Sequence, residues 1–297
     1  MAIPHPSVPV GSIVVGVDGS ESGARALDWA ITQALLEHRP LTLAHGLAPA
    51  AMAGAGEVGI DRQVFVNALQ VGGAAILEAA RQHVAARAPD LEIHDVLRVS
   101  DPREVLLALS GEASMVVLGS RGCGSVRSLL LGSVGVAVTK HARCPVVVLR
   151  PAQAGAVRNG VLVGADGTQG SQAVLGFAFR IASARYLPLT VLHCYQTAVA
   201  SVGIPHDLGV EAQLEEQRLL VAESVAGMAE EFPEVRVRTE LTHGSADDCL
   251  VRAGLRMDLV VVGAHEGGAL SRLTRGSVAS SVVEHARCTV AVVPASA

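Results

Sequence analysis

The sequence predicts an α/β protein of two tandem, doubly wound domains, because of its length, its composition and an internal repeat. Its 297 residues exceed one ordinary domain, since a domain usually holds about 100 to 200 residues. Half of the residues are apolar but only 2% are aromatic, so small aliphatic side chains must build the core. Such a core is typical of buried parallel strands with helices packed on both faces.

The two halves of the chain repeat one another. The segment IVVGVDGSESGARALDWA, which begins at Ile13, returns as VLVGADGTQGSQAVLGFA at Val161, at an offset of 148 residues. Farther along, MVVLGSRGCG at Met115 pairs with LVVVGAHEGG at Leu259, at an offset of 144 residues. Four residues are therefore missing from the second copy, and we place the deletion in the loop after the second strand.

The repeat sets the domain boundaries. We expect an N-terminal tail at residues 1–10, a first domain at 11–150 and a second domain at 159–297. Residues 151–158, PAQAGAVR, form a short linker of Pro, Ala and Gly that limits how far the two domains can separate.

Within each copy, strand and helix signals alternate. Ser20 is a suitable N-cap for a first helix, and Asp101-Pro102 opens a later helix with Asp at the N-cap and Pro at N1. Strands separated by helices predict right-handed crossovers and a Rossmann-like, five-stranded, mainly parallel sheet flanked by helices in each domain. In the first copy we expect strands at 13–17, 41–45, 91–97, 115–119 and 146–149, and helices at 21–37, 63–87, from 101 onward and at 133–141.

The candidate site follows the first and fourth strands, because open parallel sheets bind ligands beyond the carboxyl ends of their strands. A glycine-rich loop at 119–125 leads to Gly132, which opens a helix. Such a loop presents backbone N–H groups and the positive end of a helix dipole, which suit an oligophosphate. No Lys follows the last glycine, so this is not a Walker loop. Ordinary turn glycines between strand and helix would give a similar pattern.

The spacing of these glycines resembles a known signature. Gly119-x-x-Gly122, nine residues and then Gly132-Ser133 resembles the ATP-binding signature G-2x-G-9x-G-(S/T) of the universal stress protein family. The segments VGVDGS and HARCPVVVL are similar to the start and the end of that family's domain. The resemblance covers nearly the whole chain in two copies, as in the tandem form found in actinobacteria.

The resemblance implies an adenine-nucleotide site in the first copy, for ATP accompanied by Mg²⁺, since oligophosphates favour a hard cation. The sequence offers no obvious metal cage made of protein ligands alone. The residues implied for the adenosine part are Gly16, Val17 and Asp18, with Ala44 at the adenine edge. Those implied for the phosphates are Gly119, Ser120, Arg121, Gly122, Gly124, Ser125, Gly132, Ser133 and Val134.

The second copy departs from the signature. Glu266 stands at the position of Gly122, and His265 at that of Arg121. A carboxylate beside a triphosphate would repel it unless a cation lies between them, so we expect the second site to bind ATP weakly or only with metal. The residues expected at the second site are Gly164, Asp166, Gly263, Gly267, Gly276, Ser277 and Val278, of which Gly263, Gly276 and Ser277 match the signature.

Charge and hydropathy restrict the partners. The formal net charge is −5 with no basic run, which argues against nucleic acid and anionic membranes as partners. The N-terminus has no apolar signal region, and we expect the apolar segments to end within about ten residues, short of the roughly 20 that span a bilayer.

Five cysteines without C-x-x-C spacing indicate neither a disulfide framework nor a zinc site. We expect a cytoplasmic protein.

The resulting hypothesis is a nucleotide-responsive regulator of the stress response. The resemblance implies that the final strands, Val146 to Leu149 and Val290 to Val293, pair with each other, and that the chain forms a homodimer.

Two alternatives stay open, a slow ATPase and a nucleotide-free interaction module. No general base or arginine finger is identifiable by spacing. His45 and His193, at matching strand ends, are expected to bond to a neighbouring loop rather than to act as bases.

Overall fold

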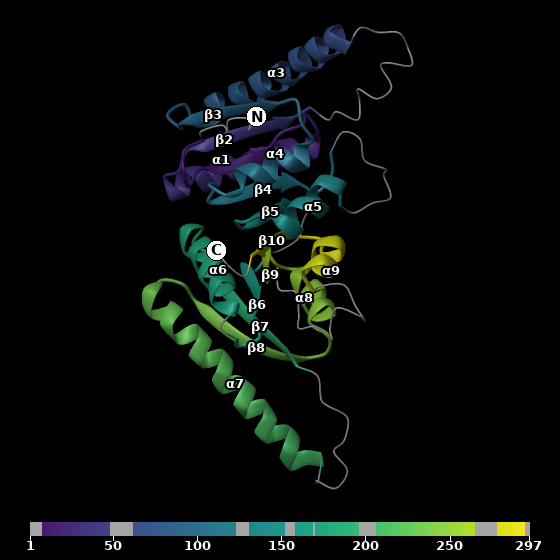
Figure 1. Ribbon diagram of the computed structural model, residues 1–297. Coiled ribbons are helices and arrows are strands. Elements are labelled where there is room, and N and C mark those ends of the chain that lie inside the picture. Colours follow the sequence, from purple (N-terminus) through teal and green to yellow (C-terminus); the bar gives the residue numbers. More distant parts are fainter. Residues whose placement is uncertain are drawn as a thin grey trace. The chain divides into compact units, whose positions relative to one another are not determined.

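The chain folds into two compact units, Met1–Arg150 and Pro151–Ala297, which are shown in Figure 1. A computed structural model describes residues 8–47, 62–122, 131–151, 158–168, 170–195, 206–264 and 278–294. Both units alternate strands with helices, and all strand pairs within each unit are parallel. The predicted α/β class with two doubly wound domains is therefore confirmed.

The first unit has the strand order β3-β2-β1-β4-β5. The central strand β1 pairs with β2 on one side and with β4 on the other, so the chain reverses its direction of winding at β1. Such a switch point opens a crevice at the carboxyl ends of the strands. The elements are β1 Ile13–Gly16, α1 Glu21–Glu37, β2 Leu41–Gly46, α3 Arg62–Arg87, β3 Ile93–Arg98, α4 Pro102–Leu109, β4 Met115–Gly119, α5 Ser133–His141 and β5 Val146–Leu149.

The second unit repeats this plan in the order β8-β7-β6-β9-β10. Helices α3 and α7 both have 26 residues and begin 144 positions apart, at Arg62 and His206. The offset has thus changed before these helices begin, which confirms the deletion after the second strand. The elements are β6 Val161–Gly164, α6 Ser171–Ala184, β7 Leu189–Tyr195, α7 His206–Glu231, β8 Val237–His243, α8 Ala246–Gly254, β9 Leu259–Gly263, α9 Val278–His285 and β10 Thr289–Val293.

Aliphatic strands form the core of the first unit. Ile13, Val14 and Val15 of β1 are fully buried, because the strand is covered on both faces. Helix α1 starts where Ser20 caps it, the hydroxyl accepting a hydrogen bond from the N–H of Gly23 at 3.0 Å. This cap satisfies one of the amides that a helix N-terminus leaves free, as the sequence predicted.

Helix α3 matches the predicted helix at 63–87 but carries a longer apolar stretch than expected. Residues Gln63–Arg87 are long and apolar enough, by length and composition, to cross a membrane, so the expected cut-off at about ten residues is wrong here. The apolar character is spread over a helix in small residues rather than concentrated in one run. Gly73, Leu77, Ala80 and Val84 form a buried stripe on it, at the spacing of one helix face. Since α3 contacts β2 and β3, this stripe is explained by packing on the sheet.

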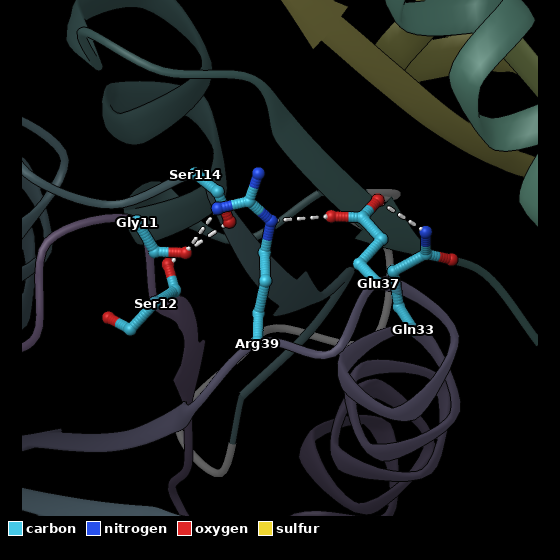
Figure 2. Close-up of polar contacts among 6 residues, drawn as sticks. All are labelled: Gly11, Ser12, Gln33, Glu37, Arg39 and Ser114. Carbon is cyan, nitrogen blue, oxygen red and sulfur yellow. Dashed lines mark hydrogen bonds and ion pairs between the residues drawn. The ribbon is translucent and has the colours of Figure 1, made fainter.

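A network of hydrogen bonds lies near the amino ends of the strands of the first sheet, opposite to their carboxyl ends (Figure 2). The fully buried Gln33 donates its side-chain amide to Glu37 at 2.6 Å. Arg39 donates its Nε to the other oxygen of Glu37 at 3.0 Å and an Nη1 hydrogen to the carbonyl of Gly11 at 3.0 Å. Helix α1, the start of β2 and the turn before β1 are thereby held together, while the carboxyl ends remain available for a site.

Candidate functional site

A cavity of about 640 Å³ opens at the carboxyl ends of β1, β2 and β4, between the first turns of α4 and α5. Its volume lies within the range of small-molecule sites, about 300 to 1,000 Å³. Every candidate residue of the first copy that the structure describes lines this cavity: Gly16, Val17, Asp18, Ala44, Gly119, Ser120, Arg121, Gly122, Gly132, Ser133 and Val134. Gly124 and Ser125 lie outside the described residues.

The loops after β1 and β4 meet closely, and glycine makes this possible. A Cβ atom on Gly122 would lie 2.7 Å from an oxygen of the Asp18 carboxylate. A Cβ atom on Gly119 would lie 2.6 Å from the backbone of Ser22 in α1. The other Asp18 oxygen accepts hydrogen bonds from the N–H and the hydroxyl of Ser20, at 3.0 and 2.6 Å. Asp18 is thus fixed in orientation by the same residue that caps α1.

The N-terminus of α5 faces the cavity without a side-chain cap. Its N-cap is Gly132, which has no side chain to accept a hydrogen bond from the first turn. By contrast, Ser20 caps α1 and Asp101 caps α4. Uncapped first-turn amides, together with the helix dipole, favour an anion in this place. The Ser133 and Val134 backbone is therefore the part of the cavity best suited to phosphate.

The buried hydroxyl of Ser120 gives a second sign of a polar ligand. Ser120 is 1% exposed and lines the cavity, and its Oγ has no hydrogen-bond partner among the described residues. Most buried polar atoms in native proteins are paired, because leaving one unpaired costs about 1 to 3 kcal/mol. A ligand oxygen in the cavity would give this hydroxyl a partner.

The first turn of α4 supplies cavity residues that the sequence analysis did not name. Asp101, Pro102 and Arg103 stand at the rim. Arg103 donates Nε to Asp101 at 2.8 Å and a second hydrogen bond from Nη2. These bonds, opposed only in part by burial, hold the pKa of Asp101 below its usual range. The sequence showed Asp101-Pro102 as a helix start, but only the pairing of β3 with β2 brings that start to the site.

Apolar side chains form the wall between α4 and the sheet. Val105, Leu106 and Leu118 line the cavity beside Ala44. Gly46 keeps β2 close to α4, since a Cβ atom there would lie 2.6 Å from the Cα of Pro102. A flat, partly apolar group such as a nucleobase fits such a wall better than a phosphate does.

The two strand-end histidines are explained by structure. The Nδ1 atom of His45 lies 2.6 Å from the Val17 carbonyl oxygen, and that of His193 lies 2.9 Å from the Ala165 carbonyl oxygen. Both therefore bond to the connection that follows the first strand of their unit, which confirms the expected role.

The second unit keeps the framework of the site but changes its lining. Gly164 and Gly263 end β6 and β9 as Gly16 and Gly119 end β1 and β4, and Asp166 follows β6 as Asp18 follows β1. Val278 begins α9. Where the first unit has Gly23, the second has Ser171, whose hydroxyl donates to Asp166 at 2.6 Å. Gly267, Gly276 and Ser277, as well as His265 and Glu266, lie outside the described residues.

A larger change concerns the apolar wall. The buried Leu192 of β7 occupies the position of Ala44 in β2. A leucine side chain takes space that the alanine of the first unit leaves open. The two units thus differ at this wall position as well as in the sequence of the loop after the fourth strand.

Among the described residues, no group of three or more His, Cys, Asp or Glu side chains could hold a metal ion. A Mg²⁺ ion at the first site would therefore take most of its oxygen ligands from phosphates and water, as Mg²⁺ usually does.

Fold and site together define a doubly wound α/β protein with a cavity at the switch point of its first sheet. The model of the universal stress protein family matches residues 10–150 and 158–294. A universal stress protein of Mycolicibacterium smegmatis is 32% identical over 95% of this chain and 96% of its own length. The chain belongs to the universal stress protein family, in its tandem form.

Solved structures of the family are similar in fold. A universal stress protein from Archaeoglobus fulgidus matches with a TM-score of 0.66 and 17% identity, over 96% of this chain and 97% of its own. A universal stress protein in complex with cAMP shares 22% identity over 46% of this chain and 96% of its own, with a TM-score of 0.37.

Proposed function

We propose that the first unit binds ATP with Mg²⁺ and that the chain acts as a nucleotide-responsive regulator in the stress response. The observation that carries the proposal is the uncapped N-terminus of α5, which opens on the same cavity as the glycine loop after β4. Backbone amides and a helix dipole there replace the water that a phosphate loses on binding.

The rest of the cavity matches the other parts of the ligand. The apolar wall beside Ala44 accommodates the base, and the oriented carboxylate of Asp18 faces the ribose hydroxyls. The Ala44 carbonyl already accepts the N–H of Val17 at 3.0 Å, so it offers a base only its second lone pair. Ser120 and Arg121, which both line the cavity, complete the polar side.

We also propose that only the first unit binds ATP tightly. Leu192 in place of Ala44 narrows the wall, and Glu266 in place of Gly122 brings a carboxylate into the phosphate loop. Both changes disfavour the nucleotide, one by volume and the other by charge.

The decisive experiment is calorimetric titration of the whole chain with MgATP, ADP and cAMP, together with mass spectrometry of ligand released from denatured protein. We expect one tight site per chain. The variant Ala44→Leu, which imports the side chain of the second unit, should remove that site, whereas Leu192→Val should leave the stoichiometry unchanged.

Two results would count against the proposal. No nucleotide in the released ligand and no titratable site would favour the nucleotide-free interaction module. Tight binding that survives Ala44→Leu in a folded variant would place the nucleotide elsewhere. A cytoplasmic location and a homodimer belong to the same proposal, and fractionation and light scattering of the whole chain test them.

A further inference from the structure

Two cysteines of the second unit stand where the first unit has cavity-lining residues. Cys194, in β7, corresponds to Gly46, and Cys249, in the first turn of α8, corresponds to Val105. Both Gly46 and Val105 line the cavity of the first unit. The matching place of the second unit therefore carries two thiols.

These thiols interact with each other. Strand β7 and helix α8 pack together, and Cys249 lies close enough to Cys194 to raise the pKa of that thiol. Both are free cysteines in the structure. Neighbouring thiols on elements that pack together are candidates for a disulfide, which needs their Cα atoms within about 7 Å of each other.

The groups around the pair favour Cys249 as the sulfur that reacts first. The Nη2 group of Arg252 donates to the Sγ of Cys249 at 3.5 Å. Cys249 lies in the first turn of α8, near the positive end of the helix dipole. Asp247 lies in the same turn. Burial acts to raise the pKa of Asp247, but hydrogen bonds from Ser281 and Ser245 outweigh it and leave that pKa lowered, so the carboxylate is held by partners of its own.

Cys194 lies in a different environment. Burial, and then the neighbouring Cys249, raise its pKa to about 12, so it remains a thiol at neutral pH. It is half-buried whereas Cys249 is 3% exposed. Cys194 is therefore the member of the pair that solvent reaches, while Cys249 is buried beside the guanidinium of Arg252.

We propose that Cys194 and Cys249 form a reversible oxidation site, at which hydrogen peroxide converts the two thiols into a disulfide. The Cys249 thiolate attacks one peroxide oxygen, the O–O bond breaks, and the departing hydroxide takes up a proton to become water. The resulting sulfenic acid is attacked by the Cys194 sulfur. Its S–O bond breaks, and the second hydroxide leaves with the Cys194 proton as another water.

The product joins the end of β7 to the first turn of α8, at the carboxyl edge of the second sheet. In the first unit the same edge opens as a cavity. The two copies thus respond to different signals at equivalent places, an oxidant in the second unit and a small ligand in the first. The oxidation site does not depend on whether the first unit binds nucleotide.

The test uses the reduced full-length chain, treated with hydrogen peroxide, quenched, denatured and alkylated. We expect a loss of two titratable thiols, a mass lower by about 2 Da before alkylation, and one peptide pair linked through Cys194 and Cys249. Dithiothreitol should restore both thiols. The thermal midpoint of the second unit should rise on oxidation and return on reduction.

Matched variants come from the first unit itself. Cys194→Gly and Cys249→Val import the residues at the equivalent positions and should abolish the two-thiol loss. Cys144→Ser, at a buried cysteine whose pKa burial also raises to about 12, should leave it unchanged. The proposal is overturned if peptide mapping of the oxidised wild-type chain finds both residues alkylated, finds either one bridged to a different cysteine, or finds oxygen added without a bridge.

Discussion

Gly132→Ala is the sharpest test of the phosphate end of the cavity, because it changes the site and spares the fold. The residue has φ −74° and ψ 158°, a conformation that alanine adopts freely. The nearest atom to an added Cβ is the Ser120 carbonyl oxygen, at 3.9 Å. Among the described residues, the new methyl group therefore makes only an ordinary van der Waals contact, and it stands beside the first-turn amides of α5.

The expected effects on stability nearly cancel. Alanine is a poorer N-cap than glycine, which destabilises the folded state by roughly 1 kcal/mol. Alanine also restricts the unfolded chain more than glycine does, which stabilises the folded state by about 0.4 to 1 kcal/mol. The free energy of unfolding should change by less than about 1 kcal/mol. The loss of one hydrogen bond to a charged phosphate, at about 1.5 to 3 kcal/mol, should weaken MgATP binding roughly 10- to 100-fold.

The assay is calorimetric titration with MgATP, paired with urea unfolding of the same protein. Gly72→Ala is the matched control: it lies in α3, away from the cavity, with no atom within 4 Å of an added Cβ. It should raise stability by about 0.5 to 1 kcal/mol and leave affinity unchanged. A Gly132→Ala protein that keeps both its stability and its wild-type affinity would refute the assignment of phosphate to α5.

Three other predictions concern the framework of the first unit. Ser20→Ala should lower the free energy of unfolding by about 1 kcal/mol through loss of the α1 cap, measured by urea unfolding; an unchanged value would contradict the cap. Glu37→Ala should cost about 1 to 3 kcal/mol in the same assay, because it removes a partner of the buried Gln33 amide, and a cost as small as that of an exposed pair would contradict this. Arg103 lowers the pKa of Asp101, so Asp101 stabilises the fold above its unfolded pKa and this contribution is lost as pH falls through the lowered one. In Arg103→Ala that acid-linked loss should shrink in unfolding curves from pH 2 to 6, and an unaltered pH dependence would contradict the coupling.

Part of the site could be predicted from sequence because it lies in contiguous motifs. The run from Gly16 to Asp18 and the loop from Gly119 follow apolar strands directly, and strand ends of a parallel sheet meet at one edge. The glycines in these two segments indicate places where the backbone of one loop comes close to another residue, as Gly122 does to Asp18. The repeat itself fixed which residues of the two copies correspond.

What the tertiary structure decided is the set of residues that arrive from elsewhere in the chain. Arg103 reaches the rim because β3 pairs with β2, and nothing in its local sequence marks it as a site residue. The contact of Cys194 with Cys249 likewise depends on how α8 packs on β7. Local sequence determines turns, caps and strand ends, because these obey short-range sterics and hydrogen bonding. Proximity between distant segments depends on which strands pair and how helices pack on them, and only the folded chain sets that.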